Sequence, residues 1–372
     1  MGCGNNMKRI LCILSGMNAG GAETFLMKIY RKLDKTKYQI DFCVNVTEKN
    51  FYEDEIIEYG GKMFRIPTKS ENLQEYKKSL YEVVKNGCYD SVLRITSNGM
   101  GFLDLKVAKD AGAKRCCARS SNSSDGKGVK LWLAHRLGRL LYSKSVDVKF
   151  APSDLAAIYT FGQAEYNRGK VEILHNGVDL KFFKYEEESA KNIRREFKIE
   201  DDVKIVGHVG RLMEQKNHLF LVDVFDEIHK KDEKTVLMIV GKGELEEKIK
   251  FYISSKHLED SVIFTGVRSD IPAVMSAMDV FVFPSFFEGM PNTVIEAQAT
   301  GLPCIIADTI TKEADITGLV QYLPLSISAE CWADAALDKL SGKRKDTYLD
   351  LMSQGYDIDT VVEKFVKLVF GE

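Results

Sequence analysis

Short apolar runs alternate with stretches of helical periodicity along almost the whole chain of 372 residues. The apolar runs have the length of strands, and the stretches between them repeat apolar residues every three or four positions, as amphipathic helices do. Strands and helices that alternate in this way form parallel sheets with helices on both faces, so the sequence predicts an α/β fold. The predicted strands are Arg9–Leu14, Tyr38–Val46, Lys62–Ile66, Ser91–Ile95, Val146–Phe150, Val171–Leu174, Lys204–Val209, Thr235–Val240, Val262–Thr265, Val280–Phe283, Cys304–Ala307 and Val320–Leu323.

The alternation is interrupted once, between about Phe182 and Asp202, where most side chains are charged. A solvated linker or a surface helix explains such a segment. The chain then divides into two doubly wound, Rossmann-like halves that face each other across a cleft, which we place at residues 1–180 and 181–356. The remaining tail, 357–372, carries an apolar stripe along one helical face, and we expect it to pack back on the first half.

The composition is that of a soluble globular protein, with 45% hydrophobic and 28% charged residues. The formal net charge is −2, so the broad basic excess of a general nucleic-acid-binding protein is missing. No run approaches the roughly 18 apolar residues of a spanning helix, and the N-terminus has no apolar core of a signal peptide. The eight cysteines are scattered without a Cys-x-x-Cys pair, as in proteins of a reducing compartment. We therefore expect a cytoplasmic protein.

The first candidate site follows the first predicted strand and reads Gly16-Met-Asn-Ala-Gly20-Gly21-Ala-Glu23. Small residues let the backbone approach a ligand, and the helix that follows presents free N–H groups to an anion. A tight turn without a ligand explains the same residues. The spacing is not the Gly-x-Gly-x-x-Gly of dinucleotide binding, which disfavours the alternative of an NAD-dependent oxidoreductase.

The second candidate follows the first strand of the second half and reads Gly210-Arg211-Leu-Met-Glu-Gln-Lys216-Asn217. Arg211 and Lys216 beside a helix N-terminus suit a diphosphate, because a guanidinium and an ammonium both donate to phosphate oxygens. Two solvated surface cations are the simpler alternative.

The third candidate follows the strand Val280–Phe283 and continues into a helix that Pro291 begins and Gly301 ends. Glu288 lies in the loop and Glu296 lies inside the helix, where carboxylates can bind hydroxyls while backbone N–H groups bind phosphate or sugar oxygens. A Glu288 that complements the helix dipole and an exposed Glu296 are the alternative. The predicted binding residues of this loop and first turn are Gly289, Met290, Pro291, Asn292 and Thr293.

Other patterns favour structural roles. Gly241 and Gly243 suit a tight strand-to-helix turn, and Asp357 and Asp359 precede the last helix, where capping explains them better than a metal. The six histidines show no metal-ligand spacing, so we expect no metal site.

The segment 127–144 is basic and amphipathic. It could rest on an anionic membrane surface. Packing against the first sheet explains the same leucines equally well, and both interpretations stay open for Leu133, Leu137, Leu140 and Leu141.

Taken in order, these motifs resemble the GT-B retaining glycosyltransferases of group 4, the glycogen-synthase-like group. The run from Phe287 to Cys304 is most similar to bacterial exopolysaccharide and capsule glycosyltransferases, and the similarity covers nearly the whole chain. The motifs that carry it are Gly20-Gly21-Ala-Glu23, Ile173-Leu-His-Asn176-Gly177-Val-Asp179, Gly210-Arg211-Leu with Lys216-Asn217, and Glu288-x7-Glu296.

The resemblance implies a UDP- or GDP-sugar donor bound mainly by the second half, no further cofactor and no catalytic metal. Arg211 and Lys216 match the diphosphate-binding residues, Glu288 the contact to the donor sugar, and Glu296 the contact to the ribose. Gly20 and Gly21 match the loop of the first, acceptor-binding half that closes on the donor. The acceptor implied is a growing or polyprenyl-linked saccharide, with the anomeric configuration retained and with peripheral contact at the inner face of the membrane as an open possibility.

One departure concerns the first half, where relatives carry a His-rich stretch near the donor sugar and this chain reads Arg119-Ser-Ser-Asn122. Arg119 or Asn122 could take over that contact. The departure also keeps open a catalytically weak or inactive homologue that binds sugar nucleotides.

Overall fold

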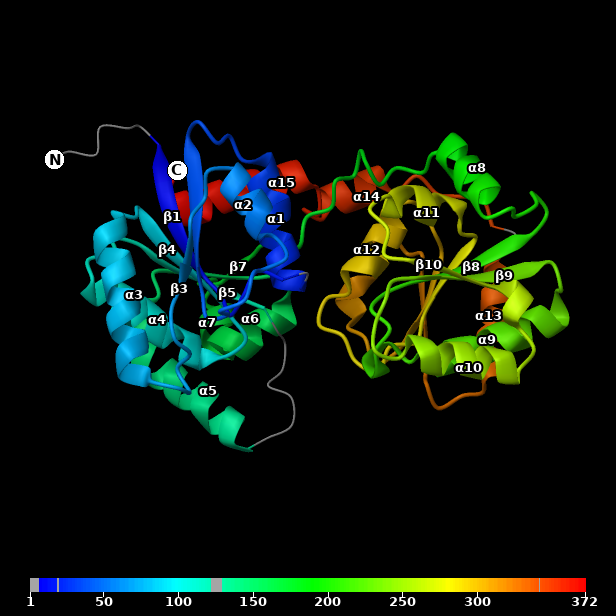
Figure 1. The fold of residues 1–372 in the computed structure, drawn as a ribbon, viewed down its shortest axis with the longest axis horizontal. Coiled ribbons are helices and arrows are strands. Elements are labelled where there is room, and N and C mark those ends of the chain that lie inside the picture. The colour runs from blue at the N-terminus through cyan, green and yellow to red at the C-terminus, as the bar shows by residue number, and fades with distance from the viewer. Residues whose placement is uncertain (1–6, 19, 122–128, 341) are drawn as a thin grey trace. The chain divides into compact units, whose positions relative to one another are not determined.

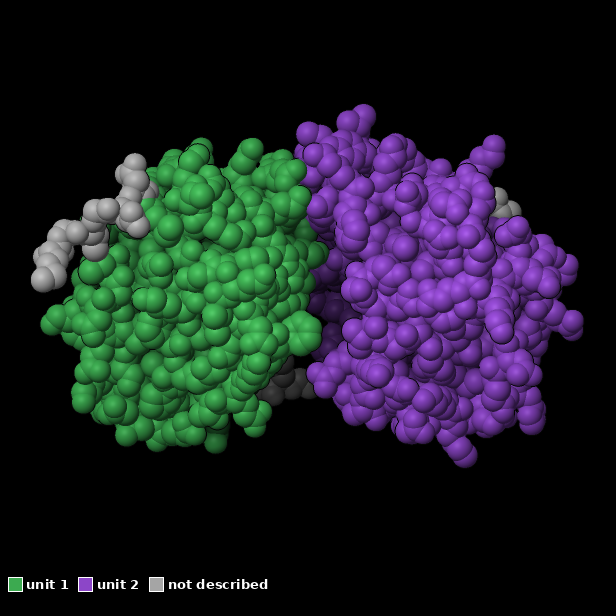
Figure 2. Space-filling view, turned by 45° about the horizontal axis from the view of Figure 1, so that its top comes forward, with its two compact units in different colours: residues 1–177, 358–372 green, residues 178–357 purple. Residues whose placement is uncertain are grey.

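The computed structural model describes residues 7–18, 20–121, 129–340 and 342–372. The chain forms two compact units, which Figure 2 shows in different colours. Unit 1 comprises residues 1–177 and 358–372, and unit 2 comprises residues 178–357. Each unit is a parallel sheet with helices on both faces, which confirms the predicted α/β class (Figure 1).

Unit 1 contains a seven-stranded sheet in the order β3-β2-β1-β4-β5-β6-β7. Its strands are β1 (Lys8–Ile13), β2 (Tyr38–Val44), β3 (Met63–Arg65), β4 (Ser91–Thr96), β5 (Cys116–Ser120), β6 (Val148–Ala151) and β7 (Glu172–Ile173). Its helices are α1 (Gly21–Lys32), α2 (Glu53–Glu58), α3 (Leu73–Gly87), α4 (Phe102–Asp110), α5 (Val129–Tyr142), α6 (Asp154–Phe161), α7 (Gln163–Asn167) and α15 (Ile358–Phe365), with short turns η1 (Gly99–Gly101), η2 (Ser143–Ser145) and the π-helical η6 (Val366–Phe370).

Strand β5 is absent from the predicted strands. Its residues, Cys-Cys-Ala-Arg-Ser, include no β-branched or aromatic side chain, so the pattern gives no strand signal. The segment is nevertheless a central strand, paired with β4 on one side and β6 on the other, and every residue in it is buried. Burial on both faces of the sheet outweighs the weak propensity here.

The last helix belongs to the core of unit 1. Val361, Phe365 and Val369 pack in the same cluster as Ile10 of β1 and Phe25 of α1. The helix begins at Ile358, and Ser91 Oγ of β4 donates to the Val369 carbonyl at 2.5 Å. The apolar stripe of the tail is thus buried on the α1 face of the sheet.

Unit 2 contains a six-stranded sheet in the order β10-β9-β8-β11-β12-β13. Its strands are β8 (Lys204–Val209), β9 (Thr235–Val240), β10 (Val262–Gly266), β11 (Val280–Phe283), β12 (Cys304–Ala307) and β13 (Val320–Leu323). Its helices are α8 (Glu187–Glu196), α9 (His218–Lys231), α10 (Glu246–Ser255), α11 (Ile271–Ala277), α12 (Asn292–Ala299), α13 (Ala329–Leu340) and α14 (Tyr348–Ser353), with turns η3 (Glu214–Lys216), η4 (Glu259–Ser261) and η5 (Lys312–Ala314).

The charged segment between the halves is the surface helix α8, the second of the two predicted alternatives. Its charged face is solvated, while Ala190 and Ile193 are buried in the core of unit 2. Within the described ranges, no helix is both long enough and apolar enough to cross a membrane.

Candidate functional site

The two loops with the predicted cations and carboxylates flank one point in the sheet of unit 2. Its strand order reverses between β8 and β11. In doubly wound sheets, ligands bind at such a reversal, outside the carboxyl ends of the strands. Gly210 and Arg211 follow β8, and the loop from Pro284 to Pro291 follows β11, so both candidate motifs lie at this position.

The loop after β8 is held in place by the loop after β9. Leu212 N donates to the Lys242 carbonyl at 3.1 Å, and Leu245 N donates to the Leu212 carbonyl at 3.1 Å. A Cβ added at Gly241 would lie 2.1 Å from the Gly210 carbonyl oxygen, and one at Gly243 would lie 2.2 Å from that of Leu212. These glycines therefore allow the two loops to approach closely, which supports the structural role predicted for them. The contact between the loops fixes the backbone that carries Arg211.

Lys216 and Glu288 form an ion pair across the reversal. Their Nζ and Oε1 atoms lie 2.6 Å apart, and the side chains are only 16% and 11% exposed. The ammonium also lies 4.6 Å from the centre of the Phe283 ring, within cation–π range. Lys216 is thus a fixed cation, and the interpretation as a freely solvated surface charge is wrong for it.

Two further hydrogen bonds join the same two segments. Gln215 Nε2 donates to the Phe287 carbonyl at 2.8 Å, and Phe286 N donates to the Gln215 carbonyl at 2.9 Å. The turn η3 and the loop after β11 therefore together hold the Lys216–Glu288 pair in place.

The Arg211 side chain is less constrained by neighbouring residues than the Lys216 side chain. Its side chain is 70% exposed, and it makes a long ion pair of 3.4 Å with Glu244, which is itself exposed. Such a surface pair contributes little to stability, so the guanidinium can turn to an anionic ligand at small cost.

The third motif forms the start of α12. Pro291 stands one residue before the helix, and its carbonyl accepts from Val294 N and Ile295 N. The amides of Asn292 and Thr293 precede these first helical hydrogen bonds, in the position where helices bind anions. Glu296 is half-buried inside the helix, and Gly301, with φ of 68°, follows its end, as predicted.

Two buried histidines beside Lys216 were not assigned to the site from the sequence. His208 Nδ1–H donates to the Val282 carbonyl at 2.9 Å, so Nε2 carries the lone pair, and its ring lies 4.7 Å from that of His218. Burial lowers the pKa of His208 well below its usual value and that of His218 to about 4, with the Lys216 charge adding to both effects.

Among the described contacts, His208 Nε2 and the buried Ser285 Oγ have no hydrogen-bond partner. Buried polar atoms without a hydrogen-bond partner at a strand end indicate a candidate binding site, and only the structure reveals them.

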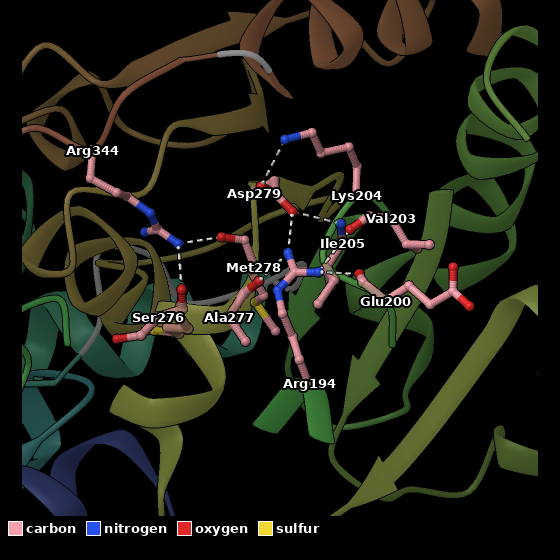
Figure 3. Close-up of polar contacts among 11 residues, drawn as sticks. Arg194, Glu200, Val203, Lys204, Ile205, Ser276, Ala277, Met278, Asp279 and Arg344 are labelled. Carbon is pink, nitrogen blue, oxygen red and sulfur yellow. Dashed lines mark hydrogen bonds and ion pairs between the residues drawn. The ribbon is translucent and has the colours of Figure 1, made fainter. Parts of the chain in front are cut away.

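Charged side chains also gather at the amino end of the same sheet (Figure 3). There Asp279 Oδ2 accepts from Arg194 Nη2 at 3.1 Å and from Ile205 N at 2.8 Å. Arg344 donates to the carbonyls of Met275 at 2.9 Å, Ser276 at 3.2 Å and Met278, and also to that of Thr300 at 3.1 Å. These donors bind the carboxyl ends of α11 and α12 and the residue before β11.

The remaining candidates belong to unit 1. Helix α1 begins at Gly21 directly after Gly20, and a Cβ at Gly20 would lie 2.4 Å from Glu23 Oε2. Arg119 at the end of β5 is fully buried, donates to Asn176 Oδ1 at 2.6 Å and lies over the Phe25 ring at 3.7 Å. Burial lowers its pKa to about 9, so it stays charged at neutral pH. Asn122 lies outside the described residues.

No group of three or more His, Cys, Asp or Glu side chains with the geometry of a metal site occurs among the residues that the structure describes.

Comparison with known proteins identifies the family. Residues 189–318, within unit 2, match the family described as "Glycosyl transferases group 1". EpsF of Bacillus subtilis, which is named as a glycosyltransferase, is 35% identical over 361 residues that cover 95% of this chain and 94% of EpsF. The capsular polysaccharide biosynthesis glycosyltransferase CapH of Staphylococcus aureus is 24% identical and covers 98% of this chain and 99% of its own.

Two further matches concern part of the sequence and the fold. The Escherichia coli UDP-Gal:alpha-D-GlcNAc-diphosphoundecaprenol alpha-1,3-galactosyltransferase is 30% identical over 66% of each chain. The crystal structure of Anabaena Alr3699/HepE in complex with UDP superposes with a TM-score of 0.78 at 17% identity, covering 97% of this chain and 99% of HepE. These matches confirm the GT-B fold and the resemblance inferred from the motifs: the chain belongs to the group 1 glycosyltransferases.

Proposed function

We propose that this protein is a retaining glycosyltransferase that moves a sugar from a nucleoside-diphosphate sugar to a lipid-linked glycan in exopolysaccharide or capsule synthesis. The observation that carries the proposal is the largely buried Lys216–Glu288 pair beside Arg211 at the strand-order reversal. The names of two relatives support the substrate classes: one states a UDP-galactose donor and a diphosphoundecaprenol-linked acceptor, the other capsular polysaccharide biosynthesis.

In the proposed reaction, the bond between the anomeric carbon and the β-phosphate oxygen breaks. The oxygen of an acceptor hydroxyl forms the new bond on the same face of the sugar, and the hydroxyl proton leaves with the nucleoside diphosphate. Negative charge therefore rises on the diphosphate as the bond breaks. Cations already fixed beside it stabilise that state without rearranging, and one such group is typically worth about 10²–10³ in rate.

Lys216 fits this task because Glu288 and Phe283 hold it before the ligand arrives. Arg211 adds a second, adjustable charge, and the amides at the start of α12 add donors. With these groups beside the diphosphate, we expect transfer to proceed without a divalent metal.

The carboxylates serve the hydroxyl groups of the donor. We assign Glu288 to the donor sugar and Glu296 to the ribose, as the family motif suggests. A uridine donor is favoured over a guanosine donor, because the Escherichia coli relative is named for UDP-galactose and HepE binds UDP-glucose.

A panel of nucleotides and nucleotide sugars in a thermal-shift assay, followed by a donor-consumption assay, tests the proposal. We expect UDP and one UDP-sugar to raise the melting temperature, and Arg211→Ala to weaken that response. Arg195→Ala is the matched control, since Arg195 is an exposed arginine of the same unit that pairs with Glu188. Stabilisation without donor consumption would favour the inactive sugar-nucleotide-binding homologue, and no response to any nucleotide would overturn the proposal.

A further inference from the structure

Two neighbouring phenylalanines of the candidate site are exposed to solvent. Phe286 and Phe287 lie in the loop after β11, directly before Glu288, and are 45% and 63% exposed. The phenylalanines of the strand itself, Phe281 and Phe283, are fully buried in the core of unit 2. The apolar sequence of β11 therefore continues into the loop, but there its rings lie outside the core.

The backbone that carries the two exposed rings is held in place. Phe286 N donates to the Gln215 carbonyl at 2.9 Å, and Gln215 Nε2 donates to the Phe287 carbonyl at 2.8 Å. On the strand side, Thr309 Oγ1 donates to the Ser285 carbonyl at 3.0 Å. Turning the rings into the core would break these hydrogen bonds, so the loop presents both rings to solvent as it is built.

Exposed apolar side chains also occur away from the site. The leucines of α5 are exposed, so packing against the first sheet is wrong for Leu133, Leu137, Leu140 and Leu141. Scattered exposed apolar side chains are normal in soluble proteins and need no ligand. Phe286 and Phe287 differ because they are adjacent, lie on a fixed loop and border the charged groups of the candidate site. Aromatic side chains next to a few placed polar groups are typical of ligand sites.

The polar groups beside the rings indicate the class of ligand. The Glu288 carboxylate, one residue beyond Phe287, pairs with the Lys216 ammonium at 2.6 Å. A carboxylate accepts hydrogen bonds from hydroxyl groups, and an aromatic ring presents a partly negative face. A pyranose carries hydroxyl groups around its rim and partly positive C–H groups on its faces. It therefore suits both, whereas a purely apolar ligand would bring the charged pair against hydrocarbon.

We propose that Phe286 and Phe287 form an aromatic platform that binds the terminal sugar of the acceptor. The inference rests on the proposed function, in which Glu288 contacts the donor sugar and Glu296 the ribose. The residues next to Glu288 then lie at the reacting end of the donor, across the diphosphate from the ribose and its base. The platform selects acceptors by the faces of their sugar. A face with only C–H groups stacks on the rings, and an axial hydroxyl group on that face weakens stacking because it loses its hydrogen bonds to water.

Saturation-transfer NMR on the protein with bound UDP tests the contact. The probes are the methyl glycosides of glucose, galactose, mannose and N-acetylglucosamine, each added alone. When aromatic protons of the protein are saturated, we expect transfer to the ring C–H protons of at least one probe, strongest on one face of the sugar. Phe286→Ser with Phe287→Ser should weaken the affinity for that probe by on the order of fivefold to tenfold.

Single changes at Phe287 separate stacking from general apolar contact. Phe287→Tyr keeps an aromatic face and should bind the probe like the wild type. Phe287→Leu keeps an apolar side chain without that face and should weaken binding by on the order of threefold or more. Phe251→Ser removes a ring that is 78% exposed on α10 and is the matched control, which should change nothing. Every variant should keep the wild-type melting temperature, because the rings that are replaced lie outside the core.

Isothermal titration with UDP distinguishes failure of the platform from failure of the proposed function. If the wild type binds UDP but no probe receives saturation, or if the two serine changes leave the affinity for the probe unchanged, the platform is wrong. It is also wrong if Phe287→Leu binds as well as Phe287→Tyr. A loss of UDP affinity in the serine variant would assign the rings to the base instead, and an oligomer that this variant dissociates would assign them to a second copy. A wild type that does not bind UDP would contradict the proposed function, and the platform with it.

Discussion

The two ends of the unit 2 sheet both gather charged side chains, but the charges are used differently. At the amino end, the half-buried Arg344 donates to several backbone carbonyls, and Asp279 accepts from Arg194 and a backbone N–H. At the carboxyl end, Arg211 is exposed and weakly paired, and buried histidine and serine atoms lack partners. The amino end is complete without a ligand, whereas the carboxyl end leaves hydrogen-bonding capacity for one.

The comparison predicts that Arg344→Met has the largest effect on stability. The change leaves carbonyls at the carboxyl ends of α11 and α12 without a donor, which should lower the free energy of unfolding by roughly 3–5 kcal/mol. Chemical denaturation measures the loss, and kcat of the remaining folded protein should stay near that of the wild type. A variant with normal stability would mean that this end is not structural.

Lys216→Ala should have the largest effect on turnover, about a 10²–10³-fold fall in kcat for donor consumption. The change should also lower stability, because it leaves the largely buried Glu288 carboxylate unpaired. Lys216→Ala with Glu288→Gln removes both charges and is the control for stability: if it restores kcat, the fixed cation is not needed.

The carboxyl end should also be the acid-sensitive end. The pKa of His218 is lowered to about 4 by burial, so the folded state favours the neutral ring. That contribution to stability is complete above the usual histidine pKa and is lost as pH falls from about 6.5 toward 4. Between pH 7 and pH 5 the loss should be about 2 kcal/mol. His218→Leu should flatten this part of the stability profile, and the exposed His257, changed to Asn, should leave it as it is.

The smallest expected effect concerns the ribose. Glu296→Gln keeps the shape of the side chain but removes its charge, and hydrogen bonds to charged groups exceed neutral ones by about 1 kcal/mol each. The donor KM should rise by on the order of fivefold to tenfold, with less change in kcat. Glu330→Gln, an exposed carboxylate on α13, is the control. An unchanged donor KM would show that Glu296 does not contact the ribose.

Local patterns were sufficient for most of the fold. Strands β8, β9, β11, β12 and β13 have the predicted bounds, because apolar runs end there at glycine, proline or charged residues. Strand β5 was missed, since its residues are buried by neighbours that the local sequence does not reveal. The sequence also left open which face of α5 is buried, because the contacts of His135 and Gly138 with η1 decide this.

The sequence predicted which residues form the candidate site but not how their side chains are arranged. Lys216 and Glu288 were each selected from motifs, yet their 2.6 Å contact joins segments 72 positions apart in the chain. Whether a cation is fixed like Lys216 or free like Arg211 depends on such distant partners. His208 and Ser285 gained interest only once their burial and unpaired atoms were known.

The central claim is that the carboxyl end of this sheet stabilises a leaving diphosphate. The most direct test compares how tightly Arg211→Ala binds the reaction product and how tightly it binds the donor. A free nucleoside diphosphate carries more negative charge than the same nucleotide joined to a sugar. Isothermal titration should therefore show that Arg211→Ala weakens binding of the diphosphate by on the order of tenfold more than binding of the nucleotide sugar. Arg195→Ala should change neither affinity, and the melting temperature of both variants should stay at the wild-type value. Equal losses for the two ligands, or none for either, would contradict the account.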